Sequence, residues 1–224
     1  MSTVISDMGV VRIPDPLPDL GAFRTWVRSD EFPEVGRICY LAGEVWIDMS
    51  KEQFFSHNQI KSEFGRVLGN LAKETGMGRY VPDGMLLTNT EADLSSQPDG
   101  AFVSNDYLRA GRVRLVEGAR DGYLELEGSP NMTLEVVSDG SVEKDTQRLP
   151  ALYWNAGVDE YWLVDARHEE LVFRIQRRGD SGFNDVEAHD GWIDSGVFRR
   201  SFKLTRINDV LGHPEFTLSV RPMS

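Results

Sequence analysis

The sequence has one cysteine and no long apolar run, and each shortage excludes a class of protein. A lone Cys39 cannot form an internal disulfide, which fits a reducing compartment. No apolar stretch approaches the roughly 18 residues that a membrane-spanning helix needs. The N-terminus lacks the basic start and apolar core of a signal peptide. We therefore expect a cytoplasmic protein with no membrane partner.

Basic residues are also in short supply. The chain has 36 acidic and 24 basic residues, and its formal net charge is −12. Proteins that hold nucleic acid do so largely by neutralising phosphates with lysine and arginine. The composition therefore predicts no general basic surface, and a nucleic-acid site would need a local cluster of positive charge.

The 224 residues fit one domain with a small extension. Residues 1–18 hold three prolines and little periodicity, which predicts an extended arm ahead of a single domain over residues 19–224. Helical spacing of apolar residues predicts helices over 19–32, 56–76 and about 146–157. Asp19 and Ser56 are the expected N-caps, and Gly76 is the expected end of the second helix. Since Pro150 disfavours a helix interior, the third helix is expected to leave Lys144 in the preceding connection.

Alternating apolar residues predict a hairpin over 37–50 that turns at Ala42-Gly43. The same signal predicts strands over 79–81, 85–88, 98–103, 132–138, 159–164, 170–177 and 183–187. The charged segment 106–131 reads as a hairpin or an insertion between strands. The order of helices and strands predicts an α+β or mixed α/β domain.

Two carboxylates stand out as candidates for chemistry. Glu135 lies in the apolar run Met132 to Val137, where an unpaired charge is costly to bury. Asp99 follows Pro98 and opens another apolar strand. Two carboxylates on adjacent strands suit Mg²⁺, which accepts a few oxygen ligands and keeps several waters. Such a metal activates its bound water, and a nearby lysine would stabilise charge on a phosphoryl oxygen; the nearest lysine is Lys144.

The motifs around these carboxylates resemble a known family. "PD" at 98–99 followed by a glutamate on a second strand resembles the PD-(D/E)XK nuclease superfamily. The run "LEVVS…D…LYWNAGVDEYWLVD", residues 134–165, is similar to the Uma-type restriction endonuclease family. "GEVWIDMS" and the helix that begins near His57 extend the resemblance over about residues 37–165.

This resemblance implies a restriction endonuclease-like core, in which helices flank a central mixed β-sheet, with an extra N-terminal hairpin and extra C-terminal strands. It implies a metal-dependent endonuclease that hydrolyses DNA phosphodiester bonds with Mg²⁺ or Mn²⁺ and works as a homodimer. Asp99 and Glu135 would hold the metal, and a lysine would complete the catalytic set.

The chain departs from the family pattern at that lysine, because the usual helix position falls on Leu149. Lys144, beside Asp145, is our candidate for the catalytic lysine, and Arg148 is a secondary candidate. The resemblance also makes Glu44 and His57 secondary candidates. Gln97 is another, since it shares a strand face with Asp99.

Two other functions remain open. The fold could serve as a non-catalytic interaction module, which the displaced lysine and the net charge favour. It could also be a metal-dependent hydrolase of a smaller phosphoester, which needs no basic groove. The discriminating feature is whether a dense basic group in the 106–131 segment lines the metal site: Arg109, Arg112, Arg114 and Arg120. The aromatic pairs Tyr153-Trp154 and Tyr161-Trp162 are interpreted as core.

Overall fold

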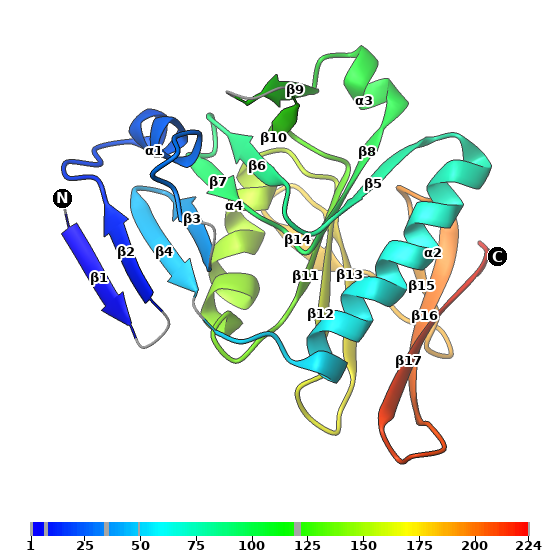
Figure 1. Cartoon of the computed structure of the whole chain (residues 1–224). Coiled ribbons are helices and arrows are strands. Elements are labelled where there is room, and N and C mark those ends of the chain that lie inside the picture. The colour runs from blue at the N-terminus through cyan, green and yellow to red at the C-terminus, as the bar shows by residue number, and fades with distance from the viewer. Residues whose placement is uncertain (1, 7–8, 34–35, 49, 119–121, 224) are drawn as a thin grey trace.

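The computed structural model describes residues 2–6, 9–33, 36–48, 50–118 and 122–223. Its centre is a six-stranded mixed sheet with the order β14-β13-β12-β11-β8-β5, here called the central sheet (Figure 1). Strands β11 and β12 run parallel, and the other neighbours are antiparallel. The bounds are β5 Gly78–Pro82, β8 Gly100–Ser104, β11 Met132–Val136, β12 Glu160–Asp165, β13 Val172–Arg178 and β14 Phe183–Asp185.

A second six-stranded sheet has the order β4-β3-β7-β6-β10-β9. Its hairpin turns at Ala42 and Gly43, both with positive φ, as the sequence predicted. The segment 106–131 supplies a short helix and two strands of this sheet. The bounds are β3 Arg37–Leu41, β4 Glu44–Asp48, β6 Leu86–Asn89, β7 Leu94–Ser96, α3 Asn105–Arg109, β9 Val113–Glu117 and β10 Tyr123–Gly128.

The predicted helices are present. Helix α1 (Leu20–Val27) has Asp19 as its N-cap, and helix α2 (Ile60–Thr75) ends at Gly76 in the left-handed region. Ser56 is not a cap, because a π-helical turn η1 (Phe54–Gln59) extends the helix backwards past it. A second π-helical turn, η2 (Lys144–Arg148), precedes α4 (Leu149–Asn155). Lys144 and Asp145 therefore lie in a helical turn, and not in the connection.

Helices α2 and α4 cover opposite faces of the central sheet. Ile60, Phe64 and Leu68 of α2 pack with Leu134 and Val136 of β11. A separate cluster joins Leu152 and Tyr153 of α4 to Tyr161 and Leu163 of β12 and to the second sheet. The face of β11 that carries Glu135 is therefore enclosed between the central sheet, α4 and the second sheet.

The remaining strands form two smaller sheets. Strands β1 (Ser2–Ser6) and β2 (Gly9–Ile13) pair as a hairpin within the predicted arm. Strands β15 (Ile193–Ser195), β16 (Arg200–Asn208) and β17 (Pro214–Pro222) form the C-terminal sheet, which lies beside α2 (Figure 1). No helix among the described residues is long and apolar enough to cross a membrane.

Candidate active site

Strand pairing brings the two predicted carboxylates together. Leu134 of β11 pairs with Gly100 of β8 in antiparallel register. Asp99 directly precedes Gly100 and Glu135 directly follows Leu134, so the two acids lie at the same end of the β8–β11 pair. The Oδ2 atom of Asp99 accepts a hydrogen bond of 2.7 Å from the backbone N–H of Val136. Asp99 is therefore anchored to the strand that carries Glu135.

Glu135 is fully buried, and its two oxygens differ in environment. Oε1 accepts a hydrogen bond of 2.7 Å from the Tyr153 hydroxyl. Oε2 has no hydrogen-bond partner, and the Lys144 Nζ atom lies 4.0 Å away from it. Burial raises the pKa of Glu135 well above its usual range against the opposing charge of Lys144, and the charges of Asp145 and Asp99 raise the pKa further.

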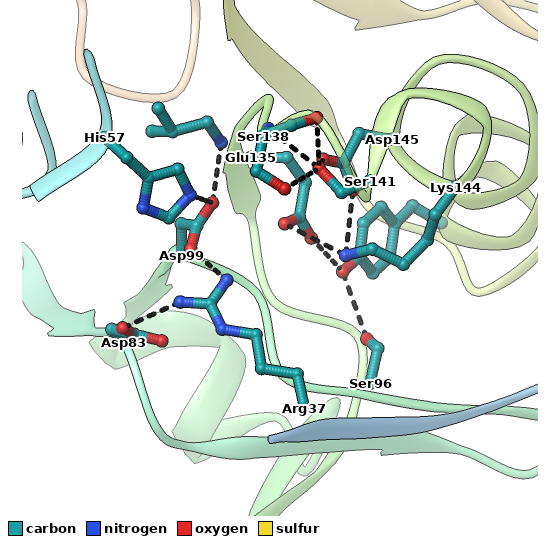
Figure 2. A network of polar contacts seen from close by, with 12 residues as sticks. Arg37, His57, Asp83, Ser96, Asp99, Glu135, Ser138, Ser141, Lys144 and Asp145 are labelled. Carbon is teal, nitrogen blue, oxygen red and sulfur yellow. Dashed lines mark hydrogen bonds and ion pairs between the residues drawn. The ribbon is translucent and has the colours of Figure 1, made fainter. Parts of the chain in front are cut away.

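Lys144 reaches into this site from η2, as Figure 2 shows. Its Nζ atom forms an ion pair of 2.8 Å with Oδ1 of Asp145, whose other oxygen accepts a hydrogen bond from the Ser141 hydroxyl. Burial alone would lower the pKa of Lys144, but the charges of Glu135 and Asp145 raise it. Lys144 is therefore a buried cation. We call Glu135, Lys144, Asp145 and Tyr153 the inner cluster.

An outer cluster lies between Asp99 and solvent. Arg37 donates through Nη1 to Oδ1 of Asp99 at 2.7 Å. Through Nη2 it also donates to Oε1 of Glu52 at 2.5 Å and to Oδ2 of Asp83 at 3.0 Å. Lys61 Nζ donates to the same two oxygens, each at 2.7 Å. Arg37, Glu52, Lys61 and Asp83 make up the outer cluster.

The secondary candidates fall in different places. His57 is buried beside Asp99, with Nε2 at 3.7 Å from Oδ2 (Figure 2). Glu44 and Arg148 form an ion pair with each other in an exposed position, and Arg148 also lies over the Trp46 ring. Within the described part of the chain, neither of them makes a hydrogen bond or ion pair with Asp99 or Glu135. Gln97 is half-buried, and the Cys39 thiol is hydrogen-bonded to its backbone.

The basic residues of the 106–131 segment have partners elsewhere. Arg109 pairs with Asp106, Arg112 contacts Tyr107, and Arg114 pairs with Glu127. None of these contacts involves the inner or the outer cluster. Arg120 lies outside the described residues.

Sequence reasoning missed the outer cluster and assigned Tyr153 to the core alone. Arg37 begins β3, Lys61 lies on α2, and Asp83 follows β5, so these residues come from separate segments. Their spacing carries no motif, because only the packing of the two sheets and α2 brings them together. For Tyr153 the sequence signal was the apolar stripe of α4, which correctly indicated burial but not the hydrogen bond to Glu135.

The donor set fits a hard divalent cation. Glu135 offers a buried carboxylate oxygen without a hydrogen-bond donor, and the second carboxylate, Asp99, is held beside β11 by the Val136 N–H and by Arg37. Among the described residues, no group of three or more His, Cys, Asp and Glu side chains is arranged to hold a metal ion. Mg²⁺ is commonly held by one or two carboxylates with water completing its octahedron, so a pair of carboxylates is sufficient.

Comparison with known proteins first defines the fold class. A crystal structure at 1.96 Å of a putative nuclease belonging to DUF820, from Anabaena variabilis ATCC 29413, superposes with a TM-score of 0.58 at 17% identity. The match covers 80% of this chain and 90% of that one. The fold is restriction endonuclease-like, which confirms the sequence prediction.

The family follows from the sequence. The model of the Uma2 family, described as "Putative restriction endonuclease", matches residues 23–205. The chain therefore belongs to the Uma2 family, and the predicted resemblance is confirmed over a longer span than the motifs covered. No functionally curated protein matches the chain.

Proposed function

We propose that this protein is a Mg²⁺- or Mn²⁺-dependent endonuclease that hydrolyses DNA phosphodiester bonds. The observation that carries the proposal is that Asp99, just before β8 and bonded to the Val136 N–H, lies beside the strand that carries the buried Glu135 with Lys144 next to it, in a chain of the Uma2 family. Asp99 and Glu135 would hold the metal. A bound metal supplies activation of water and a positive charge beside the phosphoryl oxygens.

The remaining roles in the reaction fall to side chains of the protein. Water adds to phosphorus, the bond from phosphorus to the leaving oxygen breaks, and the products are a phosphomonoester and a hydroxyl. The charges of Glu135 and Asp145 raise the pKa of Lys144, which favours its ammonium form. Lys144 therefore acts by stabilising negative charge on the phosphoryl group. Tyr153 fixes Glu135 through its hydrogen bond to Oε1.

The test is cleavage of labelled single- and double-stranded DNA with Mg²⁺ or Mn²⁺, with EDTA as a control. The proposal predicts metal-dependent cutting that disappears in Glu135→Ala and in the isosteric Glu135→Gln. Glu74→Gln, which removes an exposed glutamate of α2, is the matched control and keeps wild-type activity. Equal cleavage by wild type and Glu135→Gln would refute the proposal.

One observation favours a second candidate, a metal-dependent hydrolase of a smaller phosphoester. Arg109, Arg112 and Arg114 are paired away from the site, so they do not form a basic groove next to Asp99. Hydrolysis of bis(p-nitrophenyl) phosphate without cleavage of DNA, lost in Glu135→Gln, would favour this candidate over the first.

We also propose that two chains act together on a duplex, because two strands require two cuts. Light scattering coupled to size-exclusion chromatography tests this directly. A mass of one chain at working concentration contradicts it.

A further inference from the structure

Two cations of the outer cluster converge on the same pair of oxygen atoms. Arg37 Nη2 and Lys61 Nζ both contact Oε1 of Glu52 and Oδ2 of Asp83. The four contacts lie between 2.5 and 3.0 Å. The two oxygens come from different side chains, yet each is shared by both cations. Two oxygens held between a guanidinium and an ammonium group match the way proteins hold a phosphate.

The two acidic side chains of the outer cluster are more exposed to solvent than its two basic side chains. The side chains of Glu52 and Asp83 are 33% and 36% exposed, whereas those of Arg37 and Lys61 are 19% and 10% exposed. Asp99 lies deeper still, with its Oδ1 atom 2.7 Å from Arg37 and 3.9 Å from Lys61. The acids therefore cover the cations, and both cations lie next to a proposed metal ligand. Figure 2 shows Arg37 between Asp83 and Asp99.

Glu52 is an anion at neutral pH. Burial would raise its pKa, but the hydrogen bond from Lys61 and the charge of Arg37 lower it. The pKa of Asp83 is also lowered, because Arg37 and Lys61 outweigh its burial. The two cations thus hold two negative carboxylates at the position where an incoming anion would bind.

We propose that Arg37 and Lys61 form the site that binds a phosphodiester of a nucleic acid beside Asp99, and that Glu52 and Asp83 occupy this site in the free protein. The inference rests on the proposed function, whose substrate it positions. Binding of the strand displaces the two acids towards solvent, where their partial exposure lets them be hydrated. The acids therefore weaken binding of strands in general.

The experiment is fluorescence anisotropy of a labelled single-stranded oligonucleotide in EDTA, so that no cleavage takes place. Lys61→Gln is expected to weaken binding by about tenfold, since it removes one charge-assisted contact, and to reduce the dependence on log salt concentration by about one unit. Lys73→Gln removes an exposed charge from the same helix and leaves affinity within about twofold of wild type.

The covering acids give a test in the opposite direction. Asp83→Asn and Glu52→Gln are each expected to tighten binding by several-fold, whereas Glu74→Gln does not. A merely structural ion-pair cluster predicts loss of stability in all these variants and no gain of affinity. No binding by wild type, equal effects of Lys61→Gln and Lys73→Gln, or unchanged affinity in both acid variants would each overturn the inference.

Two controls test whether a free phosphate is sufficient for binding and whether binding is independent of the proposed nuclease activity. Inorganic pyrophosphate is added as a competitor to distinguish a free phosphate from a phosphodiester in a strand. Displacement of the oligonucleotide at millimolar pyrophosphate shows that a free phosphate group is sufficient. An oligonucleotide that stays bound shows that the strand is required. Binding in EDTA and cleavage with metal are therefore measured separately on the wild-type protein. If the nuclease proposal fails while this binding persists, the phosphate site stands without the chemistry.

Discussion

Glu135 is a buried carboxylate with one oxygen bound by Tyr153 and the other without a hydrogen-bond donor. An unsatisfied buried acceptor costs about 1–3 kcal/mol, and a charged one costs more. The protein reduces this cost by keeping Lys144 nearby and by raising the pKa of Glu135, which favours its neutral form. At the scale of the residue, Tyr153 and Lys144 therefore hold Glu135 between them, and one of its oxygens keeps no hydrogen-bond donor.

The raised pKa of Glu135 predicts how stability depends on pH. The folded protein keeps the Glu135 proton to higher pH than the unfolded chain, whose ordinary pKa is near 4.5. The stabilising contribution is complete below that value and is lost as pH rises towards the raised pKa. In Glu135→Gln this loss is absent, so the melting temperature should fall less steeply from pH 5 to 8 than in wild type.

Thermal melts at constant ionic strength check this prediction. A smaller slope persists in the variant, since burial also raises the pKa of Asp145. Parallel curves for wild type and Glu135→Gln would show that Glu135 is ionised throughout that range.

Lys144 and Arg148 can be separated by substitution. Under the proposed function, Lys144→Gln is expected to reduce metal-dependent cleavage by about 10²–10³-fold, because it removes the charge assigned to stabilising the transition state. Arg148→Gln is expected to retain nearly full activity, since Arg148 contacts Glu44 and Trp46. The measurement is the single-turnover cleavage rate at temperatures where both variants are folded. A larger loss of rate in Arg148→Gln than in Lys144→Gln would make Arg148 the better candidate.

At the scale of the element, η2 and α4 act as one support for the site. Lys144 lies at the start of η2 and Tyr153 on α4, and both side chains reach Glu135. Pro150 is the second residue of α4, and the Asp145 carbonyl five residues before it accepts a hydrogen bond from the Tyr161 hydroxyl. The continuous helical path from η2 into α4 therefore places Lys144 and Tyr153 on the same side chain, Glu135.

Tyr153→Phe tests this support. The Tyr153 hydroxyl contacts both Glu135 and the Ser96 hydroxyl, so its removal leaves two buried groups without that partner. We expect a loss of about 1–3 kcal/mol in the free energy of unfolding. Urea denaturation measures it, with the half-exposed Tyr123→Phe as a matched control that stays within about 0.5 kcal/mol of wild type.

At the scale of the whole molecule, one buried carboxylate joins the central sheet to the C-terminal sheet. Glu160 of β12 accepts hydrogen bonds from Trp162, Ser195, Gly196 and Val197. These bonds satisfy both of its oxygens, in contrast to Glu135. Glu160 is therefore a structural carboxylate, and the number of donors around each acid distinguishes the two roles.

Glu160→Ala is expected to destabilise the protein by at least about 3 kcal/mol, because several buried donors lose their acceptor at once. Urea denaturation compared with Glu187→Ala, an exposed glutamate near the same sheet edge, provides the measurement. A change below about 1 kcal/mol would mean that apolar packing alone holds the C-terminal sheet in place.

The predictions from sequence held where the signal was local. The apolar stripe and Gly76 defined α2, and Ala42-Gly43 defined the hairpin, because turn and helix chemistry depends on neighbouring residues. The same logic failed at Ser56, since hydrogen bonds of a π-helical turn override a cap signal. That Asp99 lies beside the strand of Glu135 was inferable from two apolar runs, each with a single acid.

By itself, the sequence determined the family, the mixed α/β class and the candidates Asp99, Glu135 and Lys144, because motifs and periodicity are carried by residues close along the chain. Only the tertiary structure decided that Lys144, and not Arg148, lies near Glu135. It alone brought Arg37 and Lys61 onto shared carboxylates next to Asp99. The physical reason is that ion pairs and burial depend on distances in space, which strand register and helix packing set after the chain has folded.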